Sequence, residues 1–361
     1  MNGSEVEELR AAVRAAFAEA SPSSEVRAQM ATARGWDPAV WGRLCGELGV
    51  SGLAVDEASG GSGLGYAELA MVFEEAGRVL LCAPLLSVAG LAIPLLAALA
   101  DARVSERLLP GLLDGTSIVA VVTADGDGRD VADHPGVVAE GDQLSGRGGF
   151  VIDGAHADAM LVPARGADGL GVFVVDPGTP GVTITSLITL DQTRKQARLD
   201  LDGVPAQRVG SGDASPAVAR ALDVARAMLA SEQVGVAQHS LDMTVAYAKQ
   251  RVQFGRPIGS FQALKQELAE LLILVESARS AAYAAAEAAA SDADDLSLIA
   301  AVAAAYCSEA ASVTTAQAIQ LHGGIGFTWE HDAHLYFKRA RASEEMLGTP
   351  RAHYEKVAEL I

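Results

Sequence analysis

Apolar residues recur at helical spacing in the first third and in the last third of the chain. In the first third they lie four residues apart, at Leu9, Val13 and Phe17 and again at Val40, Leu44 and Leu48. In the last third one such face comprises Phe261, Leu264, Leu268, Leu271, Leu272 and Val275. Steps of three and four residues place side chains on one face of a helix. Both regions are therefore predicted to form helices that pack through apolar faces, the last of them as a bundle.

The middle of the chain has a different pattern. Between Thr116 and about Val209, short apolar and largely β-branched runs lie at 118–122, 137–138, 160–162, 172–175, 182–188 and 197–201. Turn signals such as Asp176-Pro177-Gly178 separate them, and residues 211–215 resemble a linker. Short strands without intervening helices predict an antiparallel barrel or sandwich.

One stretch, residues 80–100, is long enough to cross a bilayer and carries no charge over its 21 residues. Pro84 and Pro94 interrupt it, much of it is alanine, and its flanks show no excess of positive charge. We therefore expect a buried core segment here and no membrane span.

Composition narrows the possible partners. The chain has 361 residues, half of them apolar, and a formal net charge of -19. Such a charge repels nucleic-acid phosphates and anionic membranes, so neither is expected as a partner, although a nucleotide cofactor needs only local donors. The three cysteines Cys45, Cys82 and Cys307 lack metal or disulfide spacing. They fit a reducing cytoplasm, and the acidic N-terminus does not resemble a signal peptide, so a cytoplasmic location and no metal are expected.

The segment from Arg251 to Gln262, with the sequence RVQFGRPIGSFQ, is the first candidate for chemistry. A helix is expected to end near Gln250, and a new one to start after Ser260 as its N-cap. Guanidinium, amide and backbone donors could together bind an anion such as a pyrophosphate. From the residues alone, an ordinary turn between helices with a surface arginine is an open alternative.

A second segment, QLHGGIGFT from Gln320 to Thr328, places three glycines within four positions. Glycine lets the backbone approach another molecule closely. The same pattern also occurs where a helix simply ends, so this segment alone is weak evidence for a binding site.

Taken together, the two segments, the helix–β–helix order and the closing run EHDAHLYFKRA at 330–340 resemble the acyl-CoA dehydrogenase family over essentially the whole chain. These flavoenzymes introduce a double bond between Cα and Cβ of an acyl-CoA thioester. The resemblance implies an α+β multidomain fold. Residues 1–115 would form an α-helical N-terminal domain, 116–212 an antiparallel β-barrel and 213–361 a C-terminal four-helix bundle. Members are commonly dimers or tetramers with FAD at the contact between two bundles.

The resemblance also implies the residues that would bind FAD. In the first segment they are Arg251, Gln253 and Phe254, with Gln262 on the next helix. In the second segment Gln320, Gly323 and Gly324 match the motif that lies along the adenosine diphosphate part, and Thr349 is the last cofactor-binding position. The half-site for the dinucleotide tail is thus expected to be intact.

The catalytic carboxylate of the family is missing from both of its known locations. One location lies 27 residues after the glutamine of the glycine motif, before a Gly-Thr pair, and here it is Leu347. The other lies ten residues before Gly235, and here it is Ala225. Neither side chain can accept the Cα proton. Weak substitutes are Glu232 and Glu345, with Glu344 beside the latter.

The middle domain also departs from the family. The motif T-E-P-x-x-G-S-D reads TADGDGRD from Thr123 to Asp130, with Arg129 in place of the serine. The motif W-I-T/S reads FVID from Phe150 to Asp153, so Ile152 replaces the hydroxyl that would face the flavin. Four changes in one pocket predict that this chain's own flavin and acyl pocket is degenerate.

These features resemble the short, base-less subunit of actinobacterial α2β2 acyl-CoA dehydrogenases that oxidise steroid side chains or other bulky acyl-CoAs. The prediction is an FAD-binding, non-catalytic subunit paired with a homologous catalytic subunit. The family's acceptor, an electron-transfer flavoprotein, is implied in the same way. One alternative is a self-sufficient dehydrogenase with a displaced acid, Glu345 or Glu232. Another is a structural subunit without flavin.

Overall fold

The computed structural model describes residues 3–361. The chain folds into two compact units, each assembled from segments that are far apart in the sequence. The first comprises the segment up to Val26 together with Ala70–Leu81 and Ala227–Ile361, and the second comprises Arg27–Leu69 and Cys82–Arg226. The domain limits predicted from the sequence, at residues 115 and 212, follow the change of residue pattern along the chain, whereas the two units follow contacts between distant segments. The predicted limits stay a prediction.

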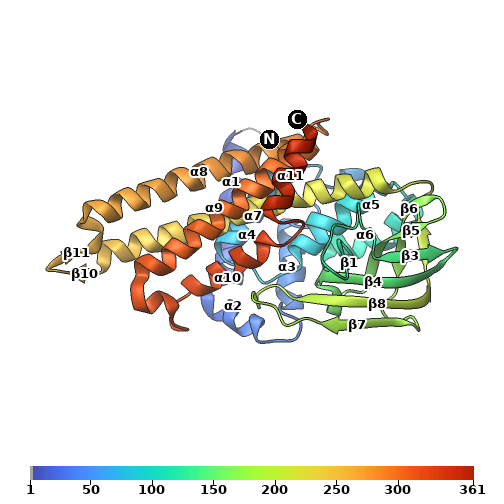
Figure 1. Cartoon of the computed structure of the whole chain (residues 1–361), viewed down its shortest axis with the longest axis horizontal. Helices are drawn as coiled ribbons and strands as arrows, with labels where there is room; N and C mark the ends of the chain where they lie inside the picture. The colour runs from blue at the N-terminus through green and yellow to red at the C-terminus, as the bar shows by residue number, and fades with distance from the viewer. Residues whose placement is uncertain (1–2) are drawn as a thin grey trace. The chain divides into compact units, whose positions relative to one another are not determined.

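Helices make up the first unit (Figure 1). They are α1 (Gly3–Ala20), most of α4 (Tyr66–Arg78), the larger part of α7 (Ser215–Gln250), α8 (Gln262–Ala290), α9 (Leu296–His322), α10 (Ala333–Glu344) and α11 (Pro350–Leu360). Small side chains let α8 and α9 pack closely, because the alanines that face the partner helix, such as Ala278, Ala282, Ala303 and Ala310, are buried. The predicted helical C-terminal domain is confirmed.

The second unit contains the end of α2 (Ser23–Met30), α3 (Pro38–Leu48), the π-helix η2 (Leu86–Ala92), α5 (Ile93–Leu99) and α6 (Ala102–Asp114), together with a sheet. Side-chain caps start two of these helices. The Asp37 carboxylate accepts the Ala39 amide at 2.8 Å, and the Asp101 carboxylate accepts the Val104 amide at 3.1 Å. The helical N-terminal region is therefore confirmed as well.

The uncharged stretch at 80–100 lies mostly in the core of the protein. It contains η2 and α5, and every residue from Leu85 to Leu96 is buried. The prediction of a buried segment is confirmed.

A different helical segment, Leu296–Phe327, is long and apolar enough to cross a membrane by length and composition. It has 32 residues and a mean hydropathy of 1.6 over its most apolar window. Of that window 56% is buried inside the protein, as in the core helix of a globular fold.

The sheet of the second unit is mixed. Its strands are β1 (Val119–Val121), β2 (Ala124–Asp125), β3 (Val137–Glu140), β4 (Gln143–Ile152), β5 (Ala159–Gly166), β6 (Gly169–Val175), β7 (Val182–Ser186), β8 (Gln196–Pro205) and β9 (Gln207–Val209). The strand order is β7-β8-β4-β3-β5-β6-β9, with β1 beside β5 and β2 beside β4.

Two features of this sheet correct the prediction of an antiparallel β-barrel. First, β5 pairs in parallel with both β1 and β3, because the chain leaves β4 and crosses through residues 153–158 to the other side of β3. Second, the order ends at β7 and at β9 without closure among the described strands, so the sheet is not a closed barrel. Local alternation of residues specifies strands but neither their partners nor their closure.

Candidate functional site

The first motif folds into a tight hairpin after α7. Strands β10 (Val252–Gln253) and β11 (Arg256–Pro257) pair antiparallel around Phe254 and Gly255. These two central residues have φ of 52° and 78°, as a type I′ turn requires. The Ile258 amide donates to the Arg251 carbonyl at 2.8 Å and closes the loop. The expected cap by Ser260 is wrong: α8 begins at Gln262 with Phe261 in the cap position, because a short 3-10 turn occupies 258–260.

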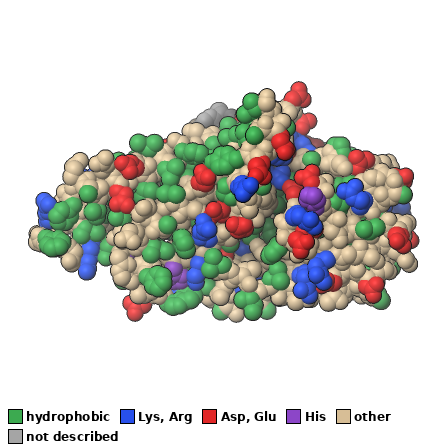
Figure 2. Space-filling view, in the orientation of Figure 1, with side chains coloured by type: hydrophobic (Ala, Val, Ile, Leu, Met, Phe, Trp, Pro, Cys, Tyr) green, Lys and Arg blue, Asp and Glu red, His purple; other side chains and the backbone are tan. Residues whose placement is uncertain are grey.

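Phe254 has a strained backbone and an exposed side chain. A positive φ is unfavourable for a bulky L-residue, and 92% of Phe254 is exposed, with only an edge contact to Phe261 at 6.2 Å between ring centroids. Packing within the chain does not account for this residue. In Figure 2, hydrophobic and basic side chains gather at the left of the view, where Figure 1 places β10 and β11. A strained, exposed aromatic is typical of a binding position.

The second motif ends α9 and forms the 3-10 helix η5 (Gly323–Phe327). Gly323 has φ of 62° and ψ of -142°, which requires glycine. Gly324 has neither a positive φ nor any atom within 4 Å of the place where a Cβ would stand. Since nothing inside the chain requires glycine at 324, its missing side chain leaves open surface.

The two motifs line one depression of about 470 Å³, and it contains five of the predicted cofactor-binding residues: Arg251, Gln253, Gln320, Gly323 and Gly324. Arg251 is exposed and makes no ion pair within residues 3–361. Gln320 is exposed as well, and its side chain has no hydrogen-bond partner in that range. The Gln253 amide donates to the Val252 carbonyl at 2.9 Å. The Arg251 guanidinium and the Gln320 amide are thus the donors that suit an anionic group such as a pyrophosphate.

An aromatic contact joins the two halves of this depression. Tyr247, one helical turn before Arg251, stacks on His322 with 4.5 Å between ring centroids. Both residues line the depression. His322 also meets His331, at 4.4 Å between centroids. Neither Tyr247 nor His322 is among the site residues predicted from the sequence, although His322 lies inside the glycine motif.

Three predicted cofactor-binding residues lie outside this depression. Phe254 is at the tip of the hairpin, and Gln262 is the exposed first residue of α8. Thr349 caps α11, where its hydroxyl accepts the Ala352 amide at 3.2 Å. It lines a different depression of about 600 Å³ together with Glu309, Glu344 and Glu345.

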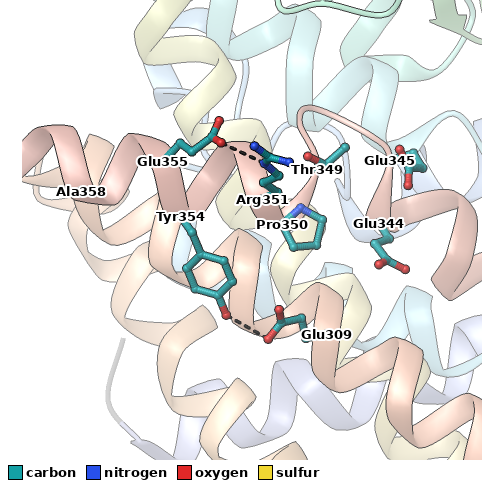
Figure 3. A pocket seen from close by; sticks show the side chains of 9 residues that line it. All are labelled: Glu309, Glu344, Glu345, Thr349, Pro350, Arg351, Tyr354, Glu355 and Ala358. Carbon is teal, nitrogen blue, oxygen red and sulfur yellow. Dashed lines mark hydrogen bonds and ion pairs between the residues drawn. The ribbon is translucent and has the colours of Figure 1, made fainter.

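That second depression contains several acids in defined hydrogen bonds (Figure 3). The Tyr354 hydroxyl donates to Glu309 at 2.9 Å, and burial and this carboxylate raise the pKa of Tyr354 to about 12. Glu344 accepts the Ser312 hydroxyl at 2.7 Å and pairs with Arg341. Glu345 is exposed at the rim.

Leu347 lies in the turn between α10 and α11. Its φ is 56°, and the following Gly348 has φ of 113°. A Cβ on Gly348 would stand 2.8 Å from the ring of the buried His353, so this position cannot carry a side chain. The turn thus holds a half-buried leucine in the left-handed region, at a cost of about 1 kcal/mol.

The other family base position, Ala225, is fully buried in α7. The next residue, Arg226, is buried and pairs with Asp223 at 2.7 Å and with Asp130 at the end of the altered T-E-P motif. Arg129, by contrast, is more than half exposed and pairs with Asp125. Ile152 is buried in β4.

Glu232 is buried in α7 and has a partner. The Arg339 Nη1 donates to its Oε1 at 2.9 Å, and both side chains are at most 4% exposed. A carboxylate held by a guanidinium in the core is a poor proton acceptor, because protonation would leave the arginine charge uncompensated.

The described residues contain no group of three or more His, Cys, Asp or Glu side chains that could hold a metal ion.

Comparison with known proteins identifies the family. Residues 3–116 match the family model "Acyl-CoA dehydrogenase, N-terminal domain", and residues 215–361 match "Acyl-CoA dehydrogenase, C-terminal domain". The acyl-CoA dehydrogenase IpdE2 of Mycobacterium tuberculosis (strain ATCC 25618 / H37Rv) is 37% identical over 343 residues, 95% of this chain and 93% of the relative. The chain belongs to the acyl-CoA dehydrogenase family. It is therefore assigned to the flavin-dependent oxidoreductases that act on a CH–CH bond.

Two solved structures of acyl-CoA dehydrogenases share the fold over nearly the full length. A "Tcur3481-Tcur3483 steroid ACAD G363A variant" superposes with a TM-score of 0.89 at 35% identity, covering 99% of this chain and 98% of the other. The ChsE4-ChsE5 complex from Mycobacterium tuberculosis also gives a TM-score of 0.89, at 29% identity, covering 99% and 97%. Homologues of this acyl-CoA dehydrogenase chain are FAD-dependent.

Proposed function

We propose that this chain is an FAD-binding, non-catalytic subunit of a heteromeric acyl-CoA dehydrogenase. The observation that carries the proposal is a contrast between two sites. The depression that suits the dinucleotide tail keeps its donors, whereas Leu347 and Ala225 occupy both positions at which the family places its catalytic carboxylate. FAD, when bound, supplies the hydride acceptor for oxidation of the acyl-CoA, and this chain supplies groups that bind and orient its tail.

Binding of the tail is supported by groups that have no other role in the chain. Arg251 has no carboxylate partner among residues 3–361, Gln320 has no hydrogen-bond partner there, and Gly324 has no internal reason to be glycine. Unpaired donors around open backbone surface are what a pyrophosphate ligand would satisfy. Arg251 and the Gln320 amide would therefore hold the diphosphate, joined by the second amide hydrogen of Gln253, whose first is donated to the Val252 carbonyl.

The hydrogen bonds and ion pairs of the acidic side chains support the absence of catalysis by this chain. Neither leucine nor alanine can take the Cα proton, and Glu232 is held by Arg339 in the core. Among the acids of the second depression, Glu344 is tied to Ser312 and Arg341. Glu345 is exposed and lies two residues before Leu347. It is therefore the acid on which the alternative of a self-sufficient dehydrogenase depends.

The partner is proposed to be a homologous acyl-CoA dehydrogenase chain that retains the carboxylate, in an α2β2 assembly. Both solved structures described above pair two differently named chains. The first is described as a steroid dehydrogenase, which supports a steroid side chain or another bulky acyl group as substrate here. An electron-transfer flavoprotein as acceptor and a cytoplasmic location complete the proposal.

The test is to purify the full chain alone and co-expressed with a homologous chain that has glutamate at the position of Leu347. Native mass and the flavin absorbance per chain measure assembly and FAD content. We expect a 2:2 assembly in which FAD is bleached by a steroid acyl-CoA, and no bleaching by this chain alone.

Variants of the co-expressed pair then locate the base. Removing the partner's glutamate should abolish bleaching, whereas Glu345→Gln in this chain should leave it within about twofold, because an exposed rim acid contributes little to proton abstraction. Turnover by a homo-oligomer of this chain would refute the proposal. A different outcome is an active assembly in which this chain carries no flavin and in which substitutions of Arg251 and Gln320 do not change activity. That outcome would instead support a structural subunit.

A further inference from the structure

His322 is the one depression-lining side chain that is buried and still has an unsatisfied polar atom within the described part of the chain. It is 2% exposed, and it lines the depression beside Gln320, Gly323 and Gly324. Its Nε2 is buried and has no hydrogen-bond partner among residues 3–361. Such an atom costs about 1–3 kcal/mol unless a partner satisfies it in the functional state.

The tautomer of His322 follows from its other nitrogen. Nδ1 lies 2.6 Å from the Ala318 carbonyl oxygen, one turn back along α9. A carbonyl can only accept, so Nδ1 carries the hydrogen and donates. Burial lowers the pKa of His322, and the neighbouring His331 acts in the same direction, against the hydrogen bond to Ala318. The ring is therefore neutral at pH 7, and Nε2 presents a lone pair.

We propose that His322 Nε2 accepts a hydrogen bond from a ribose hydroxyl of the bound dinucleotide. This inference rests on the proposed function, and it adds a residue and a ligand group to that site. The lone pair of a neutral histidine cannot bind a phosphate oxygen, which has no hydrogen to give at neutral pH. It needs a donor. FAD carries hydroxyls on both sides of its diphosphate, on the ribityl chain and on the ribose, and the ribose hydroxyls belong to the adenosine half that the glycine motif is expected to contact.

The neighbours of His322 fit this assignment. Arg251 and Gln320 provide donors for the diphosphate on the same depression, and the bare Gly324 lets a sugar approach the end of α9. The Tyr247 ring stacks on the imidazole and the His331 ring meets it at a tilt of 50°, and with the hydrogen bond of Nδ1 to Ala318 these contacts restrict the direction of Nε2. Nε2 itself is buried, and the exposed Gln320 and Ile325 line the same depression beside it, so a hydroxyl that reaches Nε2 has to displace flexible surface side chains and no core residue.

The experiment compares two probes on the full-length chain in its purified assembly: ADP and 2′,3′-dideoxyadenosine diphosphate. Calorimetry measures both affinities. Wild type should bind ADP about tenfold more tightly than the dideoxy probe, the size of one net hydrogen bond. His322→Phe keeps a ring for the stack but removes the acceptor, so it should weaken ADP by about tenfold and leave the dideoxy probe unchanged.

Two further variants control for packing. His322→Gln places an amide oxygen near Nε2 and should restore part of the preference for ADP. His239→Phe changes another half-buried histidine that stacks on an aromatic ring, that of Tyr336 at 4.6 Å, and should leave both affinities as in wild type. Equal affinity of His322→Phe and wild type for ADP would overturn the assignment.

Failure of this inference differs from failure of the proposed function. A wild-type chain that binds FAD and ADP but does not distinguish ADP from the dideoxy probe refutes the role of His322 alone. A chain or assembly that binds neither FAD nor ADP refutes the flavin site itself. Because the wild-type comparison needs no variant, the result stands even if His322→Phe does not fold.

Discussion

Arg339 and Glu232 form an ion pair inside the first unit, with Nη1 to Oε1 at 2.9 Å and almost no exposure of either side chain. The two residues are 107 positions apart in the sequence. They join α10 to α7, so the pair contributes to the packing of the helix that contains Ala225 and of the helix that precedes Leu347. Glu232, the only glutamate in α7, thus has a structural partner among the described residues.

Replacing Glu232 by glutamine is expected to destabilise the fold by about 3–5 kcal/mol, because Arg339 would be left buried without its carboxylate. Urea unfolding measures the loss. The double variant Glu232→Gln/Arg339→Met should recover much of it, since an apolar side chain needs no partner. A stable Glu232→Gln chain that keeps FAD but loses flavin bleaching would instead identify Glu232 as a base.

Phe254→Asn should stabilise the chain while impairing its binding site. Asparagine tolerates the positive φ at 254 and creates an Asn-Gly pair, the preferred type I′ turn, and the exposed phenylalanine contributes little packing. A gain of about 1 kcal/mol would raise Tm by roughly 2 °C. FAD content or assembly should fall.

A matched control for that variant is Ala100→Gly, at another exposed residue with positive φ, which ends α5. It should raise Tm by a similar amount and leave FAD content unchanged. Loss of FAD in both variants, or in neither, would contradict a binding role for Phe254.

Arg251→Gln should lower the affinity for FAD by about 10–100-fold, because charge-assisted hydrogen bonds contribute about 1.5–3 kcal/mol. Flavin fluorescence titration measures the affinity. Arg256→Gln makes the same charge change directly after the turn, where the guanidinium lies 4.0 Å from the Phe261 ring centroid and outside the depression. Equal losses in the two variants would point to overall charge and not to a site.

Acid should destabilise the first unit partly through Glu74. Burial acts to raise the pKa of this carboxyl, but Arg279 and Arg10 outweigh it and hold the pKa below its ordinary 4.5. The folded chain therefore binds this proton less readily than the unfolded chain. Its stabilisation is complete above pH 4.5 and is lost as the pH falls through the lowered pKa.

Glu74→Gln should accordingly lower Tm at neutral pH and flatten the loss of Tm as the pH falls below 4.5. The control Glu276→Gln removes a half-exposed partner of the same Arg279, 3.3 Å away, and should change stability by about 0.5 kcal/mol or less. An unchanged acid limb in Glu74→Gln would show that other groups control the acid transition.

The sheet and the first motif show where sequence patterns stop being informative. Alternation marked the strands between 116 and 209, but the parallel pairing of β3 with β5 depends on a crossover that no local pattern specifies. Glycine and proline marked the turn after Gln250, but the 3-10 turn at 258–260 displaced the start of α8 past Ser260. In both cases the choice depends on contacts made after the chain has folded back on itself.

The sequence by itself determined that neither position 347 nor position 225 carries a carboxylate. It gives the residue at each position directly, and the spacing of these positions from the family motifs does not depend on how the chain folds. It also placed Arg251, Gln320 and the glycines in one predicted site, through the resemblance of two motifs. Only the tertiary structure decided that Arg339 neutralises Glu232, that Phe254 is exposed, and that His322 Nε2 has no partner among the described residues. Burial and pairing depend on side chains brought together across long stretches of chain, and a linear pattern does not specify those encounters.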